Sequence, residues 1–218
     1  MSARRTANPA AESPRIRDAD RTRQIILDAA THEFAALGLG GARMDRIAER
    51  AGVDKRLIYY YFNNKDDLFL AVLERAYAAI RRAEQAQHLE ALNPADAVRK
   101  LVEFTWRYYL EHPEFLCLLN SENLHQAEHL KRSSQVRDIH SPFVQWLADI
   151  LKRGQEMGVF RKGVDPIQLY ISIASIAYFY LSNKYTLSEI FGRDLMSPEA
   201  LDERLAHMIE VILGYLRP

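Results

Sequence analysis

Residues 44–62, MDRIAERAGVDKRLIYYYF, decide the fold of this chain. They read as two short helices joined by a turn at Gly52, where a glycine accepts a left-handed backbone. Ala48 is small enough to let the two helices approach closely, and Val53 fills the angle between them. Asp54 is a good cap for the second helix. The pattern predicts a helix-turn-helix, whose second helix typically enters the major groove of DNA.

The second helix has two distinct faces when each residue is placed 100° after the last. Ile58 and Phe62 fall together and are expected in the core. The opposite face carries Arg56, Leu57 and Tyr60, of which Tyr60 is placed to meet base edges or sugars. The flanks and ends carry candidates for phosphate contacts: Lys55, Tyr59, Tyr61 and Lys65. A solvated, basic face with half-buried rings is the alternative interpretation.

The charge of the chain is unevenly distributed. Lys plus Arg equal Asp plus Glu over the 218 residues, at 29 each, yet residues 1–65 hold 12 basic and 8 acidic side chains. A basic first third on a slightly acidic remainder favours a polyanionic partner for that third, with a chance fluctuation of charge as the alternative. Cys117 is the only cysteine, and no apolar run is long enough for a membrane span. We therefore expect a cytoplasmic protein that does not associate with membranes.

The rest of the chain has helical periodicity with proline punctuation. We expect an all-α fold of about nine helices, the first ending at Gly38 and later ones beginning near residues 64, 94, 113, 126, 166 and 198. Five prolines follow boundary residues and are expected at helix starts: Pro94, Pro113, Pro142, Pro166 and Pro198. The predicted division is a disordered basic arm at 1–20, a three-helix head at 21–66 and a larger helical body at 67–218.

Residues 22–77 resemble the DNA-binding domain of the tetracycline-repressor (TetR) family of regulators. The resemblance rests on ILDAA, F-x-x-x-G, IA-x-x-AGV, IYYYF and NKDDLF taken together. It implies DNA contacts at the positions Lys55, Arg56, Leu57, Tyr59, Tyr61 and Lys65. It also implies a helical body that binds a small molecule and forms a homodimer.

Two positions depart from the pattern of the family. Arg43 stands where many relatives have Ser or Thr, so the helix cap is lost, although Arg43 can still bind a phosphate. Arg56 stands where a small residue is common, which favours a base-reading role such as a bidentate contact to guanine over a phosphate contact. The arm before Thr22 is either a minor-groove contact or a disordered segment.

The last third of the chain favours a dimer. Residues 166–185, PIQLYISIASIAYFYLSNKY, are apolar on nearly all faces, more than one intramolecular neighbour can bury. The final helix carries a broad apolar stripe: Leu201, Leu205, Met208, Ile209, Ile212 and Leu216. A four-helix bundle across a two-fold axis would bury both segments, whereas the alternative is the central helix of a monomer core.

Aromatic and amide side chains between residues 94 and 185 indicate a ligand pocket in the body. The candidates are Trp106, Tyr109, Asn120, Asn123, Phe143, Trp146, Tyr178 and Asn183, with plain core packing as the alternative. Asn123 and Asn183 are the stronger candidates, because we expect them to be buried and buried amides need partners. The body is similar to family members that regulate heterocycle and aromatic catabolism, which suggests an aromatic or heterocyclic effector.

Two other chemistries fit short motifs in the body. Glu122, His125 and His129 share a helix face and have metal-ligand spacing, but exposed side chains on a polar helix fit equally well. Cys117 lies in an apolar run, which favours a buried, inert thiol over a redox sensor. We expect neither a metal nor a cofactor.

The sequence therefore predicts a regulator, most simply a repressor that a small molecule releases from a palindromic operator of double-stranded DNA. No catalytic motif is evident, so an enzyme is not expected. The effector would shift the helix after Lys65 and change the separation of the two heads. The alternatives are a small-molecule-binding protein or enzyme with a vestigial helix-turn-helix, and a non-specific DNA-packaging protein.

Overall fold

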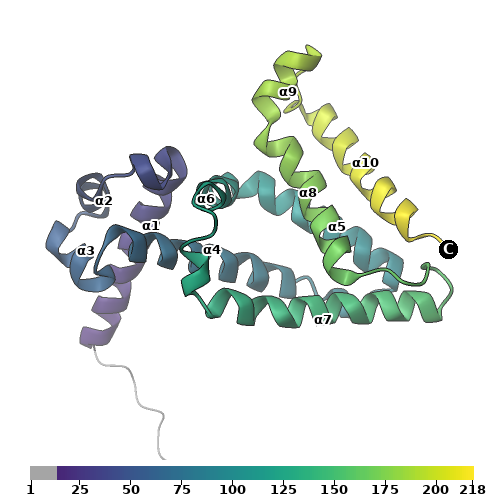
Figure 1. Cartoon of the computed structure of the whole chain (residues 1–218), viewed down its shortest axis with the longest axis horizontal. Helices are drawn as coiled ribbons and strands as arrows, with labels where there is room; N and C mark the ends of the chain where they lie inside the picture. The colour runs from purple at the N-terminus through teal and green to yellow at the C-terminus, as the bar shows by residue number, and fades with distance from the viewer. Residues whose placement is uncertain (1–13) are drawn as a thin grey trace, which may run out of the picture. The chain divides into compact units, whose positions relative to one another are not determined.

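The computed structural model describes residues 14–218, and every regular element within that range is a helix, which confirms the all-α prediction (Figure 1). The chain divides into two compact units, with the boundary between Phe69 and Leu70. Among the described residues, no helix is both long enough and apolar enough to cross a lipid bilayer.

The first unit contains three helices and the start of a fourth. Their bounds are α1 Pro14–Gly41, α2 Met44–Ala51, α3 Lys55–Phe62 and α4 Lys65–Gln85. Because α1 begins at Pro14, residues 14–20 are helical and not disordered as predicted; the remainder of the predicted arm lies outside the described residues. The helical backbone is interrupted at Gly38 (φ 65°, ψ 176°), where the long first segment of α1 ends as predicted, and a short second segment continues to Gly41.

The core of the first unit is built from the apolar stripes of its helices. Phe34 of α1 is fully buried, and its ring meets that of Phe69 edge-on at 5.0 Å. Ile47 of α2 and Ile58 of α3 are also fully buried, so each short helix is fixed through its apolar side chains. Packing of this kind stabilises helices that are too short to persist alone.

The turn between α2 and α3 has the predicted chemistry. Gly52 adopts the left-handed conformation (φ 66°, ψ 32°) and its N–H donates to the carbonyls of Ala48 and Glu49. The Asp54 carboxylate then accepts a hydrogen bond from the Arg56 N–H at 2.7 Å and caps α3. These bonds fix the angle at which α3 leaves α2.

We expect Gly52→Ala to cost about 1–2 kcal/mol, because a β-carbon disfavours left-handed backbone. A β-carbon at Gly52 meets no atom within 4 Å, so the cost is conformational and not steric. Gly40→Ala is the matched control: Gly40 has equal space and no positive φ, so alanine should stabilise α1 by up to about 1 kcal/mol. Urea unfolding, followed by circular dichroism, measures the free energy of unfolding of both variants. Equal changes in the two variants would contradict the conformational cost assigned to Gly52.

The second unit packs around α5. Its elements are the rest of α4, η1 Leu89–Ala91, α5 Pro94–Glu111, α6 Pro113–Leu124, η2 Leu130–Arg132, α7 Gln135–Glu156, α8 Pro166–Ser182, α9 Lys184–Phe191 and α10 Pro198–Leu216. Helix α5 contacts α6, α7, α8 and α10, and α8 runs beside α10 (Figure 1). Buried residues of α5, including Val98 and Leu101, form the centre of this core.

The predicted helix starts are mostly correct. Side chains of Asn93, Asp165 and Ser197 accept backbone N–H groups at the starts of α5, α8 and α10. Proline follows each of them at the first helical position, where its missing N–H costs nothing. Pro113 also begins a helix, although the His112 side chain makes no capping bond.

Three details of the helix pattern were predicted wrongly. No helix begins at residue 126, since turns and η2 fill that region and α7 starts only at Gln135. Pro142 lies inside α7 and does not start a helix. The cost of one lost hydrogen bond is offset because Phe143, Leu147 and Ile150 bury the same face of α7. Helix α9 is additional to the prediction.

Candidate functional site

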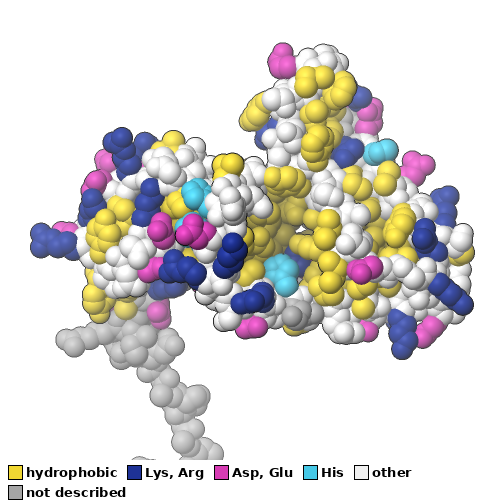
Figure 2. All heavy atoms as spheres, viewed as in Figure 1, with side chains coloured by type: hydrophobic (Ala, Val, Ile, Leu, Met, Phe, Trp, Pro, Cys, Tyr) yellow, Lys and Arg dark blue, Asp and Glu magenta, His cyan; other side chains and the backbone are white. Residues whose placement is uncertain are grey.

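Helix α3 presents the two faces that the sequence predicts. Ile58 and Phe62 are buried, whereas the side chain of Arg56 is 93% exposed and Tyr60 is 78% exposed. Leu57 is half-buried at the edge of the exposed face. The space-filling view shows Lys and Arg side chains over α2 and α3, with Asp, Glu and hydrophobic side chains among them (Figure 2). An exposed, positively charged helix of this shape is suited to the major groove of DNA.

The flanks of α3 carry the other two tyrosines. Tyr59 is 41% exposed, and Tyr61 is half-buried with its ring edge-on to that of Tyr60 at 5.4 Å. Lys65 is the first residue of α4, at the positive end of that helix dipole. The positions suit phosphate contacts, which stay predictions for all three side chains.

Glu33 of α1 supports the start of α2, a role that the sequence did not reveal. Arg43 is the N-cap residue of α2 and makes no side-chain capping bond, as predicted. Instead, its backbone N–H donates to Glu33 Oε1 at 3.3 Å, and Arg46 Nε lies 3.4 Å from the same oxygen. Because Glu33 is buried, its carboxylate substitutes for the missing cap from a neighbouring helix.

Lys55 is already engaged within the protein, although the sequence suggested a side chain free to reach phosphate. Its Nζ lies 2.7 Å from Asp45 Oδ1, and this hydrogen bond raises the pKa of Lys55. A phosphate must therefore compete with Asp45 for the ammonium group.

Asp45→Asn should tighten binding to all duplexes alike, because it frees Lys55 for a phosphate. The salt dependence of log K should steepen by about one unit if one more phosphate is neutralised. Glu49→Gln is the matched control, since it removes one exposed acid from the same helix without touching the Lys55–Asp45 pair. Anisotropy titrations at several salt concentrations measure the slope, and an equal slope in both variants would contradict this prediction.

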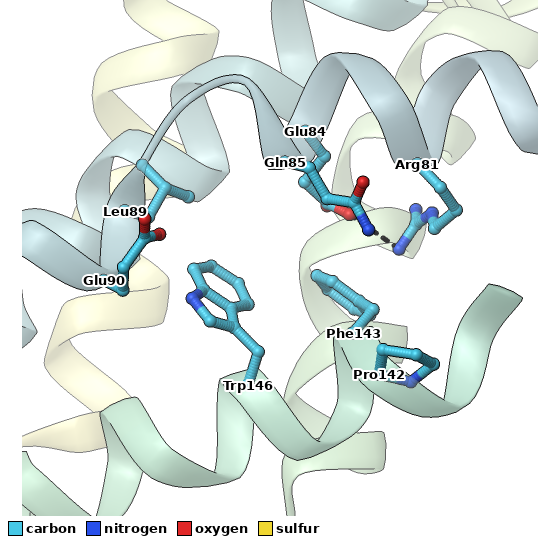
Figure 3. Close-up of a pocket in the computed structure, with 8 residues that line it drawn as sticks. All are labelled: Arg81, Glu84, Gln85, Leu89, Glu90, Pro142, Phe143 and Trp146. Carbon is cyan, nitrogen blue, oxygen red and sulfur yellow. Dashed lines mark ion pairs between the residues drawn. The ribbon is translucent and has the colours of Figure 1, made fainter. Parts of the chain in front are cut away.

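The second unit contains a pocket of about 300 Å³ between α4, η1 and α7. Its lining residues are Arg81, Glu84, Gln85, Leu89, Glu90, Pro142, Phe143 and Trp146. Side chains from α7 point toward those of α4 across the space (Figure 3). The pocket thus combines aromatic surface with charge, as small-molecule sites commonly do.

The charged part of this pocket is a buried pair on α4. Arg81 Nη1 lies 2.8 Å from Glu84 Oε2, and both side chains are about 95% buried. The Arg81 guanidinium also lies over the Phe143 ring, 4.3 Å from its centre, and donates to the Tyr170 hydroxyl at 3.3 Å. Burial raises the pKa of Glu84 to about 7, an effect that the positive charge of Arg81 only partly offsets.

Only two predicted ligand-binding residues, Phe143 and Trp146, line this pocket. Trp106 is buried edge-on against Tyr180, and Tyr109 is buried in a stack with Phe115. Both therefore serve the core, which was the alternative interpretation.

The amide candidates also lie elsewhere. Asn120 accepts a hydrogen bond from Tyr178, so these two predicted residues meet each other outside the pocket. The Asn123 and Asn183 amides donate to the carbonyls of Leu119 and Phe179, one turn earlier in each chain segment. Neither is buried, so the expectation of buried amides was wrong.

The sequence does not single out the charged pocket residues Arg81 and Glu84, which lie on α4 and outside the range 94–185 where it predicts the pocket. Their sequence signal is weak but present: with Leu73 and Tyr77 they continue one helical stripe at steps of four, four and three. Charged residues in such a stripe are normally exposed. Only the opposing face of α7 makes this stripe a pocket wall.

Glu122 and His129 form a structural pair. The Glu122 carboxylate lies 2.7 Å from His129 Nδ1 and accepts the backbone N–H groups of His129 and Leu130. Both residues are buried, whereas the sequence suggested exposed side chains on one helix; α6 in fact ends at Leu124. Within residues 14–218, no group of three potential ligands is arranged to hold a metal ion.

Cys117 is exposed, contrary to the expectation of a buried thiol. Phe115, Leu116 and Leu118 fill the buried face of α6, and Cys117 projects from the opposite side.

Comparison with known proteins decides the family. Residues 26–72 match the model described as "Bacterial regulatory proteins, tetR family", and residues 94–212 match "Tetracyclin repressor-like, C-terminal domain". The chain belongs to the TetR family. The resemblance of residues 22–77 is thereby confirmed, and the chain is a DNA-binding transcriptional regulator.

Relatives of this TetR-family chain cover nearly all of it. The HTH-type transcriptional repressor NicS of Pseudomonas putida is 40% identical over 93% of this chain and 96% of its own length. The crystal structure of SCO4942 from Streptomyces coelicolor has a TM-score of 0.69 at 26% identity, covering 90% of this chain and 99% of that one. FadR from Bacillus subtilis, solved in complex with stearoyl-CoA, has a TM-score of 0.64 at 17% identity, covering 89% and 99%, and so shares the fold.

Proposed function

We propose that this TetR-family protein is a homodimeric repressor that leaves a palindromic operator when a small aromatic molecule enters the pocket of its second unit. The observation that carries the proposal is the exposed face of α3, where Arg56 and Tyr60 stand opposite the buried Ile58 and Phe62. The relative NicS is itself named a repressor. An enzymatic role has no support in the residues of this site.

The pocket supports control by an effector. FadR, which shares the fold, is named in complex with stearoyl-CoA, so this fold can hold an organic ligand. Phe143 and Trp146 offer flat apolar surfaces that suit an aromatic ring. Helix α4 is continuous from Lys65 to Gln85, so it carries both a predicted phosphate contact and the pocket residue Arg81. An effector that prefers one position of α4 would shift the population away from the DNA-binding state.

Exposed apolar side chains support the homodimer. Ile167, Ile171 and Phe179 of α8 and Val211 and Tyr215 of α10 are each between 41% and 57% exposed. Hydrophobic side chains gather visibly over this part of the chain (Figure 2). A two-fold interface would remove them from water.

On the last helix, residues of the predicted apolar stripe pack inside their own unit, and a neighbouring face of the helix is exposed. Met208, Ile212 and Leu216 are buried in the core of their own unit, so these three are not available for a partner. The proposed interface of α10 consists instead of the neighbouring face with Val211 and Tyr215.

The test is selection of duplexes from a random library by the full-length protein, with sedimentation to measure the stoichiometry. A preferred palindrome bound by two chains is expected. Similar affinity for every duplex would indicate a packaging protein instead. Unchanged binding by the Lys55→Ala/Arg56→Ala variant would favour a vestigial helix-turn-helix and overturn the proposal.

A further inference from the structure

The most unusual group in the second unit is the buried guanidinium of Arg81. Its side chain is only 5% exposed. Among the described residues, Arg81 Nε has no hydrogen-bond acceptor, and the 2.8 Å contact of Nη1 with Glu84 lacks hydrogen-bond geometry. Buried donors are rarely left unsatisfied in native proteins. The arginine therefore has hydrogen-bonding capacity that the protein itself does not use.

The surroundings of Arg81 define what can reach it. Phe143 packs against the guanidinium, and Trp146 lies farther along the same side of the pocket (Figure 3). Glu84 and Gln85 face these rings from α4. A planar ring stacked in this space would place a substituent close to Arg81, and a carboxylate matches the forked donors of arginine.

We propose that the effector is a planar aromatic anion whose charged group takes Arg81 over from Glu84, and that Glu84 takes up a proton from water as the effector binds. This inference rests on the proposed function, since it specifies the chemistry and the pH dependence of the same pocket.

The proton uptake follows from the charges around Glu84. Arg81 is the one cation among the described residues that line the pocket, and it cannot neutralise two buried carboxylates at once. The other titratable groups near the pair are Tyr77 of α4, Tyr108 and Tyr109 of α5, His140 of α7 and Tyr170 of α8, with Glu90 of η1 in the pocket lining. Burial raises the pKa of the four tyrosines and lowers that of His140, so all five are neutral at pH 7–8 and add no positive charge.

The sign of the pH effect is therefore fixed. Because the pKa of Glu84 is about 7, raising the pH above 7 removes the proton that the anion requires. The affinity should fall with a slope approaching tenfold per pH unit, as expected for one linked proton.

The experiment uses the full-length protein with benzoate, 2-naphthoate and their neutral amides as probes. At least one acid should raise the melting temperature and bind with measurable heat, and its amide should bind at least tenfold more weakly. Titration at pH 7.5 in two buffers of different ionisation enthalpy should show uptake of about three-quarters of a proton, because a carboxyl with a pKa of about 7 is already about one-quarter protonated at that pH. Glu84→Gln should abolish this uptake and make binding independent of pH between 7 and 8.5.

Variants at positions 81 and 84 distinguish a loss of charge recognition from a failure to fold. Arg81→Gln should lose acid binding, but it leaves Glu84 buried without a cation and can fail to fold. The Arg81→Gln/Glu84→Gln double variant places an uncharged polar side chain at both positions and should fold. It should bind an acid and its amide with similar affinity. Arg82→Gln is the control, since Arg82 is exposed on the same helix and should bind acids normally.

Release of the selected operator distinguishes this inference from the proposed function. If amides or benzylamine bind as well as the acids and release the DNA, the proposed function stands and the anionic effector is wrong. If a bound acid brings no proton, or Glu84→Gln leaves the proton uptake unchanged, the role of Glu84 is wrong. If no acid, amide or amine binds the protein or releases the operator, the anionic effector and the proposed function are both contradicted.

Discussion

Arg56→Ala is expected to abolish the preference for the selected operator over an unrelated duplex. The Arg56 side chain is 93% exposed at the first turn of α3, close to the Asp54 cap, with Nε 3.7 Å from Asp54 Oδ1. A bidentate arginine contact to guanine discriminates by roughly 10- to 100-fold, so affinity for the operator should fall by about that factor. Binding to the unrelated duplex should change far less.

The controls for Arg56 are its conservative variant and its neighbours on α3. Arg56→Lys keeps the charge but loses the forked geometry, so it should retain non-specific affinity and still discriminate poorly. Tyr59→Phe and Tyr61→Phe should weaken binding to both duplexes equally, because they remove phosphate contacts. A uniform loss of affinity in Arg56→Ala would show that Arg56 binds phosphate and does not read bases.

Phe34→Ala is expected to destabilise the first unit by about 3–5 kcal/mol, the usual cost of removing a fully buried phenylalanine. Phe34 is 0% exposed and packs edge-on against Phe69. Leu37→Ala on the same helix is the control, because Leu37 is 43% exposed and should lose far less stability. DNA binding should disappear in the first variant and persist in the second.

The two tryptophans make this measurement specific to one unit. Trp106 and Trp146 both lie in the second unit, so fluorescence follows that unit while circular dichroism follows all helices. In Phe34→Ala, the loss of helix signal should begin at lower urea than the fluorescence change. Stability equal to that of Leu37→Ala would contradict the assignment of Phe34 to the core.

The helix-turn-helix could be predicted closely because its determinants are local. The left-handed Gly52, the Asp54 cap and the buried pair Ile58 and Phe62 lie within eleven residues, and each acts through its own backbone or its own turn of helix. The partners of Lys55 and Arg43 could not be predicted in the same way. Asp45 and Glu33 reach them from other helices, at positions that no local pattern specifies.

The pocket could be predicted only in part, because its determinants are far apart in the sequence. Phe143 and Trp146 were identified as aromatics of the right kind, but Arg81 and Glu84 lie about sixty residues earlier, on a helix that the sequence assigned no role in binding. Pro142 and Cys117 were misplaced because proline is tolerated within a well-packed helix, and because a short apolar run does not reveal which face of a helix is buried.

The sequence by itself determined the all-α fold, the helix-turn-helix and the face that its second helix exposes. Periodicity, caps and turns are properties of neighbouring residues, so they can be predicted without knowledge of any distant contact. Only the tertiary structure decided that Arg81 is buried while Arg82 is exposed, and that Arg81 lies between Glu84 and Phe143. Burial and charge pairing depend on which helices pack together, and the composition of one helix does not fix that choice.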